Sequence, residues 1–168
     1  QSGAACGAAA SHSLSEPHSS ASTCENDTCR RRDTCMMLAT ASWDKTLRIW
    51  DLRTGASLAE VNTPVVVSTL AYGPRGTLLA LGDRDGGVSL ANGRTGVVFS
   101  RSSWHRGIVL ALAFDPRGES LASGGIEGDV AIWQPEPFAL RNLRRGLDAP
   151  VTALAFADDG GRIVDVNQ

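Results

Sequence analysis

Short apolar segments separated by turn residues recur along residues 37–168, and they predict strands. Residues 109–114 (Val-Leu-Ala-Leu-Ala-Phe) are apolar at every position, which is typical of a strand covered on both faces. The Asp-Pro-Arg-Gly sequence at 115–118 predicts a turn, because proline fixes φ and glycine accepts a positive φ. Further strands are expected over 121–124, 130–133 and 138–143. The pattern indicates four short antiparallel strands in about 42 residues, the spacing of one propeller blade.

Several markers repeat with this period. Gly76, Gly118 and Gly160 are 42 residues apart, and Leu79-Ala80 returns 42 residues later as Leu121-Ala122. Arg-Thr-Gly at 53–55 returns at 94–96, a step of 41. Because independent markers share one spacing, the chain is predicted to be built from repeats.

Two segments resemble the WD-repeat family. Residues 38–51 (Leu-Ala-Thr-Ala-Ser-Trp-Asp-Lys-Thr-Leu-Arg-Ile-Trp-Asp) are similar to the second half of a WD repeat, including its Trp-Asp ending. Residues 105–133 resemble nearly a whole repeat, from the opening His to Ile-Trp. The resemblance covers 37–168 and implies an all-β fold of WD-repeat β-propeller blades. It implies about three to four four-stranded antiparallel blades in an incomplete ring, approximately 37–61 (partial), 62–101, 102–143 and 144–168 (partial).

The resemblance also implies a hydrogen-bonded set of His, Ser/Thr, Asp and Trp within each blade. A buried Trp needs an acceptor for its indole N–H, and a hydroxyl can supply it. In the third repeat the matching residues are His105, Ser123, Glu127 and Trp133. Glu127 is one methylene longer than the family's Asp, so we expect strain there.

The other repeats keep less of this set. The first has Thr40, Asp44 and Trp50 but no preceding His. The second keeps only Asp85, with apolar residues in the Ser/Thr and Trp places, namely Leu81 and Ala91. We therefore expect apolar packing to hold the second blade, and we expect it to be the weakest.

Residues 1–36 differ from the repeats. They are rich in Ala, Ser and Gly and contain no aromatic residue, so we expect a disordered tail. Residues 29–36 offer no alternating segment, and the first repeat is expected to lack its innermost strand. The fourth is expected to stop after its second strand, at 162–166. The chain is therefore interpreted as part of a larger propeller.

The sequence supports catalytic and metal-binding motifs less well than it supports structural roles for the same residues. His105 and Asp115 could belong to a hydrolase triad, but no nucleophile motif accompanies them. Residues 83–86 faintly resemble a calcium loop, and a hairpin turn is favoured. The spacings of one possible zinc-ligand set are loose, namely His12, His18, Cys24, Cys29 and Cys35. We therefore predict no catalytic residue, no metal and no cofactor.

Composition adds little to this. The net charge is −2, so neither nucleic acid nor a membrane is favoured as a partner. All four cysteines lie in residues 1–36, so the repeats contain no disulfide framework. A cytoplasmic or nuclear location is expected.

The resemblance implies that partner peptides bind on the narrower face of the ring. Trp43, Arg84 and Ile126 take positions just before the network carboxylate. Positions at the start of the innermost strands are taken by Val66, Ser68, Ile108, Leu110, Pro150 and Thr152. We select four as candidate binding residues: Trp43, Arg84, Leu110 and Ile126.

The predicted function is a non-catalytic protein–protein interaction scaffold or adaptor, within a larger chain or a multiprotein complex. One alternative is a subunit of an RNA-processing or chromatin-associated complex that contacts nucleic acid directly. A propeller-type enzyme is a third possibility, for which no converging carboxylates or metal ligands are found.

Overall fold

The structure is a computed structural model that describes residues 8–9, 20–25, 36–145, 149–157 and 162–167. These residues form antiparallel sheets, and no helix occurs among them. The first sheet contains β1 (Ala8–Ala9), β2 (Ser20–Glu25), β3 (Met36–Ala41), β4 (Thr46–Asp51) and β5 (Ser57–Asn62). The second contains β6 (Val67–Tyr72), β7 (Leu78–Asp83), β8 (Gly87–Asn92) and β9 (Val98–Ser103).

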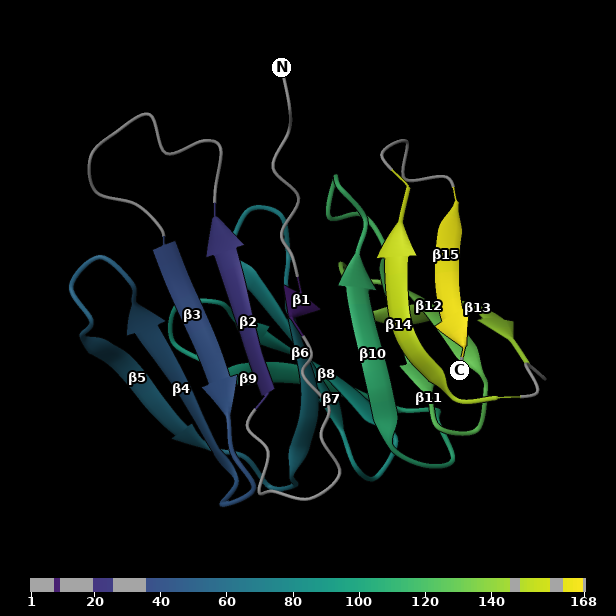
Figure 1. Cartoon of the computed structure of the whole chain (residues 1–168), viewed down its shortest axis with the longest axis horizontal. Coiled ribbons are helices and arrows are strands. Elements are labelled where there is room, and N and C mark those ends of the chain that lie inside the picture. Colours follow the sequence, from purple (N-terminus) through teal and green to yellow (C-terminus); the bar gives the residue numbers. More distant parts are fainter. Residues whose placement is uncertain (1–7, 10–19, 26–35, 146–148, 158–161, 168) are drawn as a thin grey trace.

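The third sheet contains β10 (Val109–Phe114), β11 (Leu121–Gly125), β12 (Val130–Gln134) and β13 (Ala139–Arg144), and the last pairs β14 (Val151–Phe156) with β15 (Ile163–Asn167). We call the four sheets blades one to four. Figure 1 shows β2, β10 and β14 running in the same direction through the middle of the molecule. Strand β10 lies between β6 and β14, and β6 contacts β2. Consecutive blades thus pack side by side, and the predicted all-β blade architecture is confirmed.

The first blade differs from the sequence prediction. Ser20–Glu25 pairs antiparallel with Met36–Ala41, with Ser20 opposite Ala41 and Glu25 opposite Met36. The expected absence of an innermost strand is therefore wrong, and a tail over 1–36 does not hold for this segment. The local pattern does not predict this strand, because its sequence, Ser-Ala-Ser-Thr-Cys-Glu, contains no large apolar residue. The strand also lies upstream of 29–36, the segment that directly precedes β3. Backbone hydrogen bonding to β3 therefore stabilises β2 as a strand, although the composition of β2 does not favour one.

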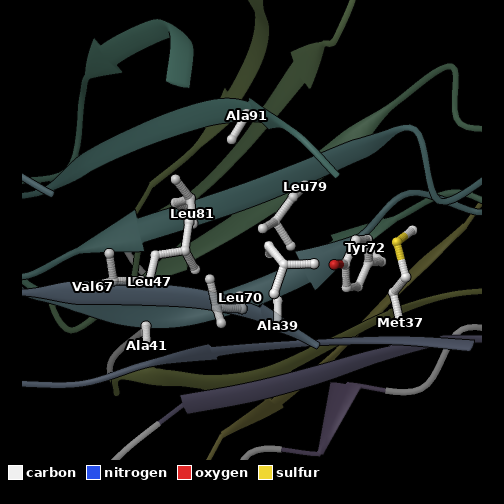
Figure 2. Close-up of a cluster of buried hydrophobic side chains, with 11 residues drawn as sticks. Met37, Ala39, Ala41, Leu47, Val67, Leu70, Tyr72, Leu79, Leu81 and Ala91 are labelled. Carbon is white, nitrogen blue, oxygen red and sulfur yellow. The ribbon is translucent and has the colours of Figure 1, made fainter. Parts of the chain in front are cut away.

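Two apolar cores hold the blades together. Blades one and two share a buried cluster to which both contribute alternate strand residues, and Figure 2 shows Leu47 and Ala39 facing Leu81 and Leu79. A second cluster lies between blades two and three and includes Leu90, Val109 and Trp133. In β8, Leu90 belongs to the cluster shared with blade three and Ala91 to the cluster shared with blade one. Blade two is therefore covered on both faces.

Two glycines allow the innermost parts of adjacent blades to approach closely. A Cβ at Gly82 would lie 2.7 Å from both Thr69 Cγ2 and Val109 Cγ1. A Cβ at Gly124 would similarly lie 2.5 Å from Val151 Cγ1 of blade four. These branched side chains rotate little, so they cannot move aside.

We predict that Gly82→Ala destabilises the fold by about 1–3 kcal/mol, because the added methyl overlaps two β-branched side chains. Urea denaturation followed by circular dichroism measures this. The matched control is Gly73→Ala, where the nearest side-chain atom would be 3.5 Å away. Equal losses in the two variants would contradict the close packing between blades two and three.

Candidate functional site

The turns of the blades gather at two opposite ends, because neighbouring strands are antiparallel. One end carries the turns 42–45, 84–86 and 126–129 and the blade connections 63–66 and 104–108. We call it the Trp43 end. The other carries the turns 73–77, 93–97, 115–120 and 135–138, and we call it the Pro74 end. The predicted binding residues Trp43, Arg84 and Ile126 all fall at the Trp43 end.

Blade three contains a continuous hydrogen-bonded chain of four side chains. Trp133 Nε1 donates to Ser123 Oγ at 2.8 Å, and Ser123 Oγ lies 2.8 Å from His105 Nε2. His105 Nδ1 lies 2.6 Å from Glu127 Oε1. The imidazole thus bridges the serine hydroxyl and the carboxylate through its two ring nitrogens. Every ring nitrogen is then paired, which stabilises the polar groups at this buried position.

The longer side chain of Glu127 is accommodated by a neighbouring glycine. A Cβ at Gly125 would overlap the Glu127 carboxylate. Glu127 Oε2 is buried and has no hydrogen-bond partner among the described residues. The glutamate therefore reaches His105 at a normal distance but occupies the space that a side chain at 125 would need.

Blade one keeps a smaller version of this arrangement. Trp50 Nε1 donates to Thr40 Oγ1 at 3.0 Å, at a half-buried site. Asp44 is exposed and accepts hydrogen bonds from the Thr46 hydroxyl and backbone N–H, at 2.6 and 2.9 Å. These two hydrogen bonds, the side-chain one first, hold the pKa of Asp44 below its ordinary value. Asp44 thus stabilises its own turn.

Blade two departs from the prediction. Asp85 is exposed at the turn, whereas Asp83 is buried and accepts from the backbone N–H groups of Asp85 and Gly87. The second oxygen of Asp83 binds Arg101, with Nη2 at 2.8 Å and Nε at 3.2 Å. The prediction that Asp85 is the network carboxylate is therefore wrong, because alignment with Glu127 selects position 85 while the buried carboxylate belongs to Asp83. Blade two therefore has a polar contact of its own in addition to apolar packing at Leu81.

The exposed residues at the Trp43 end form a strip that crosses three blades. The guanidinium carbon of Arg84 lies 4.7 Å from the centre of the Trp43 ring, in a cation–π contact between blades one and two. Trp43 and Ile126 are 50% and 44% exposed. Leu110 is half-buried in β10, so less of its side chain is accessible to a partner.

Trp104 belongs to the same end and was missed by the sequence analysis. It is 45% exposed, and its backbone N–H donates to Gly86 O, in the turn that follows Arg84. The loop continues to Gly107, where a Cβ would meet Ile126 Cγ2. The backbone of the loop 104–108 therefore runs from the turn that contains Arg84 to Ile126. The sequence feature that could have identified Trp104 is its place directly before His105, although that position lies outside the family's motif.

The remaining predicted positions have varied roles. Ser68 Oγ donates to Val109 O at 2.6 Å, so it joins blades two and three. Val66 and Ile108 are half-buried, as is Thr152, while Pro150 is exposed. These residues support the innermost strands more than they extend the exposed strip.

Other candidate chemistry finds little support in the described part of the chain. It holds no group of three or more His, Cys, Asp or Glu side chains that could bind a metal. His12, His18, Cys29 and Cys35 lie outside the described residues. None of the described residues belongs to a helix long and apolar enough to cross a membrane.

Comparison with known proteins identifies the repeats. The family model "WD domain, G-beta repeat" matches residues 16–51 and 97–134. The first match includes β2, which agrees with its place in blade one. The chain is also 46% identical over 48 residues to the U3 small nucleolar RNA-associated protein 21 homolog of Schizosaccharomyces pombe. That match covers 29% of the chain and 5% of the relative's length. Two segments of the chain therefore match WD repeats.

We predict that Ser123→Ala costs about 1–3 kcal/mol of stability, because it leaves the buried Trp133 N–H and His105 nitrogen without a partner. The control variant is Thr40→Ala, which leaves only the half-buried indole N–H of Trp50 without a partner. We expect it to lower the unfolding free energy by less than Ser123→Ala does. Urea denaturation of both variants measures the difference. A larger loss for Thr40→Ala would refute the central role of the blade-three chain.

A second prediction concerns the space between Gly125 and Glu127. Gly125→Ala is expected to destabilise the fold, and Glu127→Asp is expected to relieve the clash by shortening the acid. A double-mutant cycle of unfolding free energies should therefore give a favourable coupling of about 0.5–3 kcal/mol. Strictly additive costs would show that the two positions do not compete for space.

Proposed function

We propose that this chain is a non-catalytic protein-interaction scaffold whose partners bind at the Trp43 end. The observation that carries the proposal is the exposed strip across three blades, formed by Trp43, Arg84, Trp104 and Ile126. Large exposed apolar side chains that lie together on a soluble domain are typical of interaction surfaces. Tryptophan and arginine are also the types most often found as binding hot spots.

The strip is held in place by the fold before a partner arrives. Arg84 follows the buried Asp83, whose carboxylate binds the turn's backbone and Arg101. The cation–π contact orients Arg84 and Trp43 relative to each other. Such preorganisation reduces the entropy lost on binding, so a small strip can hold a peptide segment effectively. Rigid presentation of side chains is the proposed mechanism, with no bond chemistry.

The wider setting is proposed on the same basis. WD repeats are characteristic of proteins that assemble with other proteins, so we propose that the chain acts within a multiprotein complex. An intracellular setting, cytoplasmic or nuclear, is the proposed location.

An RNA-processing complex is the second candidate. It is favoured by the similarity to a protein named as associated with U3 small nucleolar RNA. Direct nucleic-acid contact is less favoured, because the net charge is −2 and the strip at the Trp43 end presents one arginine among apolar residues. Membership of such a complex through protein contacts is compatible with the scaffold proposal.

The proposal predicts that Trp43→Ala/Arg84→Ala lowers partner recovery by about tenfold or more, because hot-spot truncation costs about 2 kcal/mol or more. The tagged chain is incubated with extract of the source cells, and bound proteins are quantified by mass spectrometry. Ultraviolet crosslinking of the same samples measures bound RNA.

The matched control is Leu58→Ala/Phe99→Ala, which removes two exposed apolar side chains from the outer strands β5 and β9. Equal loss in the control would show that the Trp43 end is not the docking surface. Recovery that disappears after nuclease treatment, together with crosslinked RNA, would favour the nucleic-acid alternative.

A further inference from the structure

A second concave site lies at the Pro74 end, away from the exposed strip. A cavity of about 460 Å³ opens between blades two and three. Its walls come from the turn after β6, the turn after β10 and the turn between β12 and β13. Its charged lining residues are Arg75, Arg117, Arg141, Glu119 and Glu136.

Two of the arginines occupy equivalent positions in adjacent repeats. Arg75 and Arg117 each follow a proline and precede a glycine with positive φ, at 67° and 76°. Both turns close with a backbone hydrogen bond, from Gly76 N–H and from Gly118 N–H, at 2.9 and 3.0 Å. The proline ring and the turn hydrogen bond limit backbone freedom at both arginines.

The two turns also lie against each other. A Cβ at Gly118 would be 3.3 Å from the ring of Pro74. Packing between the blades therefore brings the two Pro-Arg-Gly turns to one cavity, and Arg141 joins them from β13. This convergence depends on the tertiary structure, since the arginines come from three separate segments.

Two of the arginines lining the cavity, Arg117 and Arg141, are not paired with its glutamates. No ion pair in the described part of the chain joins Arg117 or Arg141 to Glu119 or Glu136. All of these side chains belong to exposed residues. Guanidinium groups in this arrangement can each offer two parallel N–H donors to a phosphate or carboxylate.

We propose that this cavity binds a phosphorylated serine or threonine of a partner protein, with a basic residue close to the phosphate in the partner's sequence. A single dianionic phosphate matches the converging arginines. The two glutamates would attract the neighbouring basic side chain. They would repel a continuous nucleic-acid backbone, and the single aromatic residue lining the cavity, Phe114, is half-buried rather than open for base stacking.

The test uses the full chain and two degenerate peptide libraries that share a fixed central position. That position is phosphoserine in one library and serine in the other. Peptides retained by the immobilised chain are identified by sequencing, and a labelled representative is titrated by fluorescence anisotropy. A single-stranded uridine 20-mer is titrated in parallel.

We expect enrichment of phosphopeptides that have Lys or Arg near the phosphate. Arg117→Ala/Arg141→Ala should weaken the representative by about 10- to 100-fold, because hydrogen bonds to charged groups are worth about 1.5–3 kcal/mol. The matched control is Arg53→Ala/Arg94→Ala, which removes the same charge from exposed turns outside the cavity. Trp43→Ala should leave this binding unchanged, so the outcome is independent of the Trp43 end.

Three results would overturn the proposal. They are equal retention of the two libraries, equal weakening by the control pair, and uridine 20-mer binding that depends on Arg117 and Arg141 without phosphopeptide enrichment. Circular dichroism melting of each variant checks the fold. Arg117→Lys provides a milder variant, which should retain part of the binding because it keeps the charge but loses the paired donors.

Discussion

Blade two of this chain is covered on one face by blade one and on the other by blade three, and the other features depend on such packing between blades. In β8, Leu90 enters the cluster shared with blade three while Ala91 enters the cluster shared with blade one. Strands of adjacent blades approach so closely that glycine is required at 82 and 124. Because the sheets are held at this spacing, turns from different blades meet at each end, and composite surfaces arise there.

Within this common packing, the blades pair their polar groups differently. Blade three uses four side chains from His105 to Trp133, blade one uses Thr40 with Trp50, and blade two uses Asp83 with Arg101. In each case a carboxylate or hydroxyl pairs with the N–H group of another side chain. The repeated backbone therefore accommodates different pairs of polar side chains in different blades.

The two ends differ in chemistry because alternate turns of each repeat face opposite directions. At the Pro74 end the turn sequence is itself repeated, so Arg75 and Arg117 converge on one cavity. At the Trp43 end the corresponding positions hold different residues, as Trp43, Arg84 and Ile126 illustrate. Repeated arginines thus line the cavity at the Pro74 end, whereas the exposed apolar side chains of the strip lie at the Trp43 end.

The sequence by itself determined the repeat, the blade architecture and most strands, because alternating apolar residues and Pro-Gly turns act locally. The tertiary structure alone decided three things. It paired β2 with β3, it made Asp83 rather than Asp85 the buried carboxylate, and it placed the backbone of Trp104 against the turn that contains Arg84. Each depends on contacts between segments distant in the chain, where pairing partners and available space override local pattern and motif alignment.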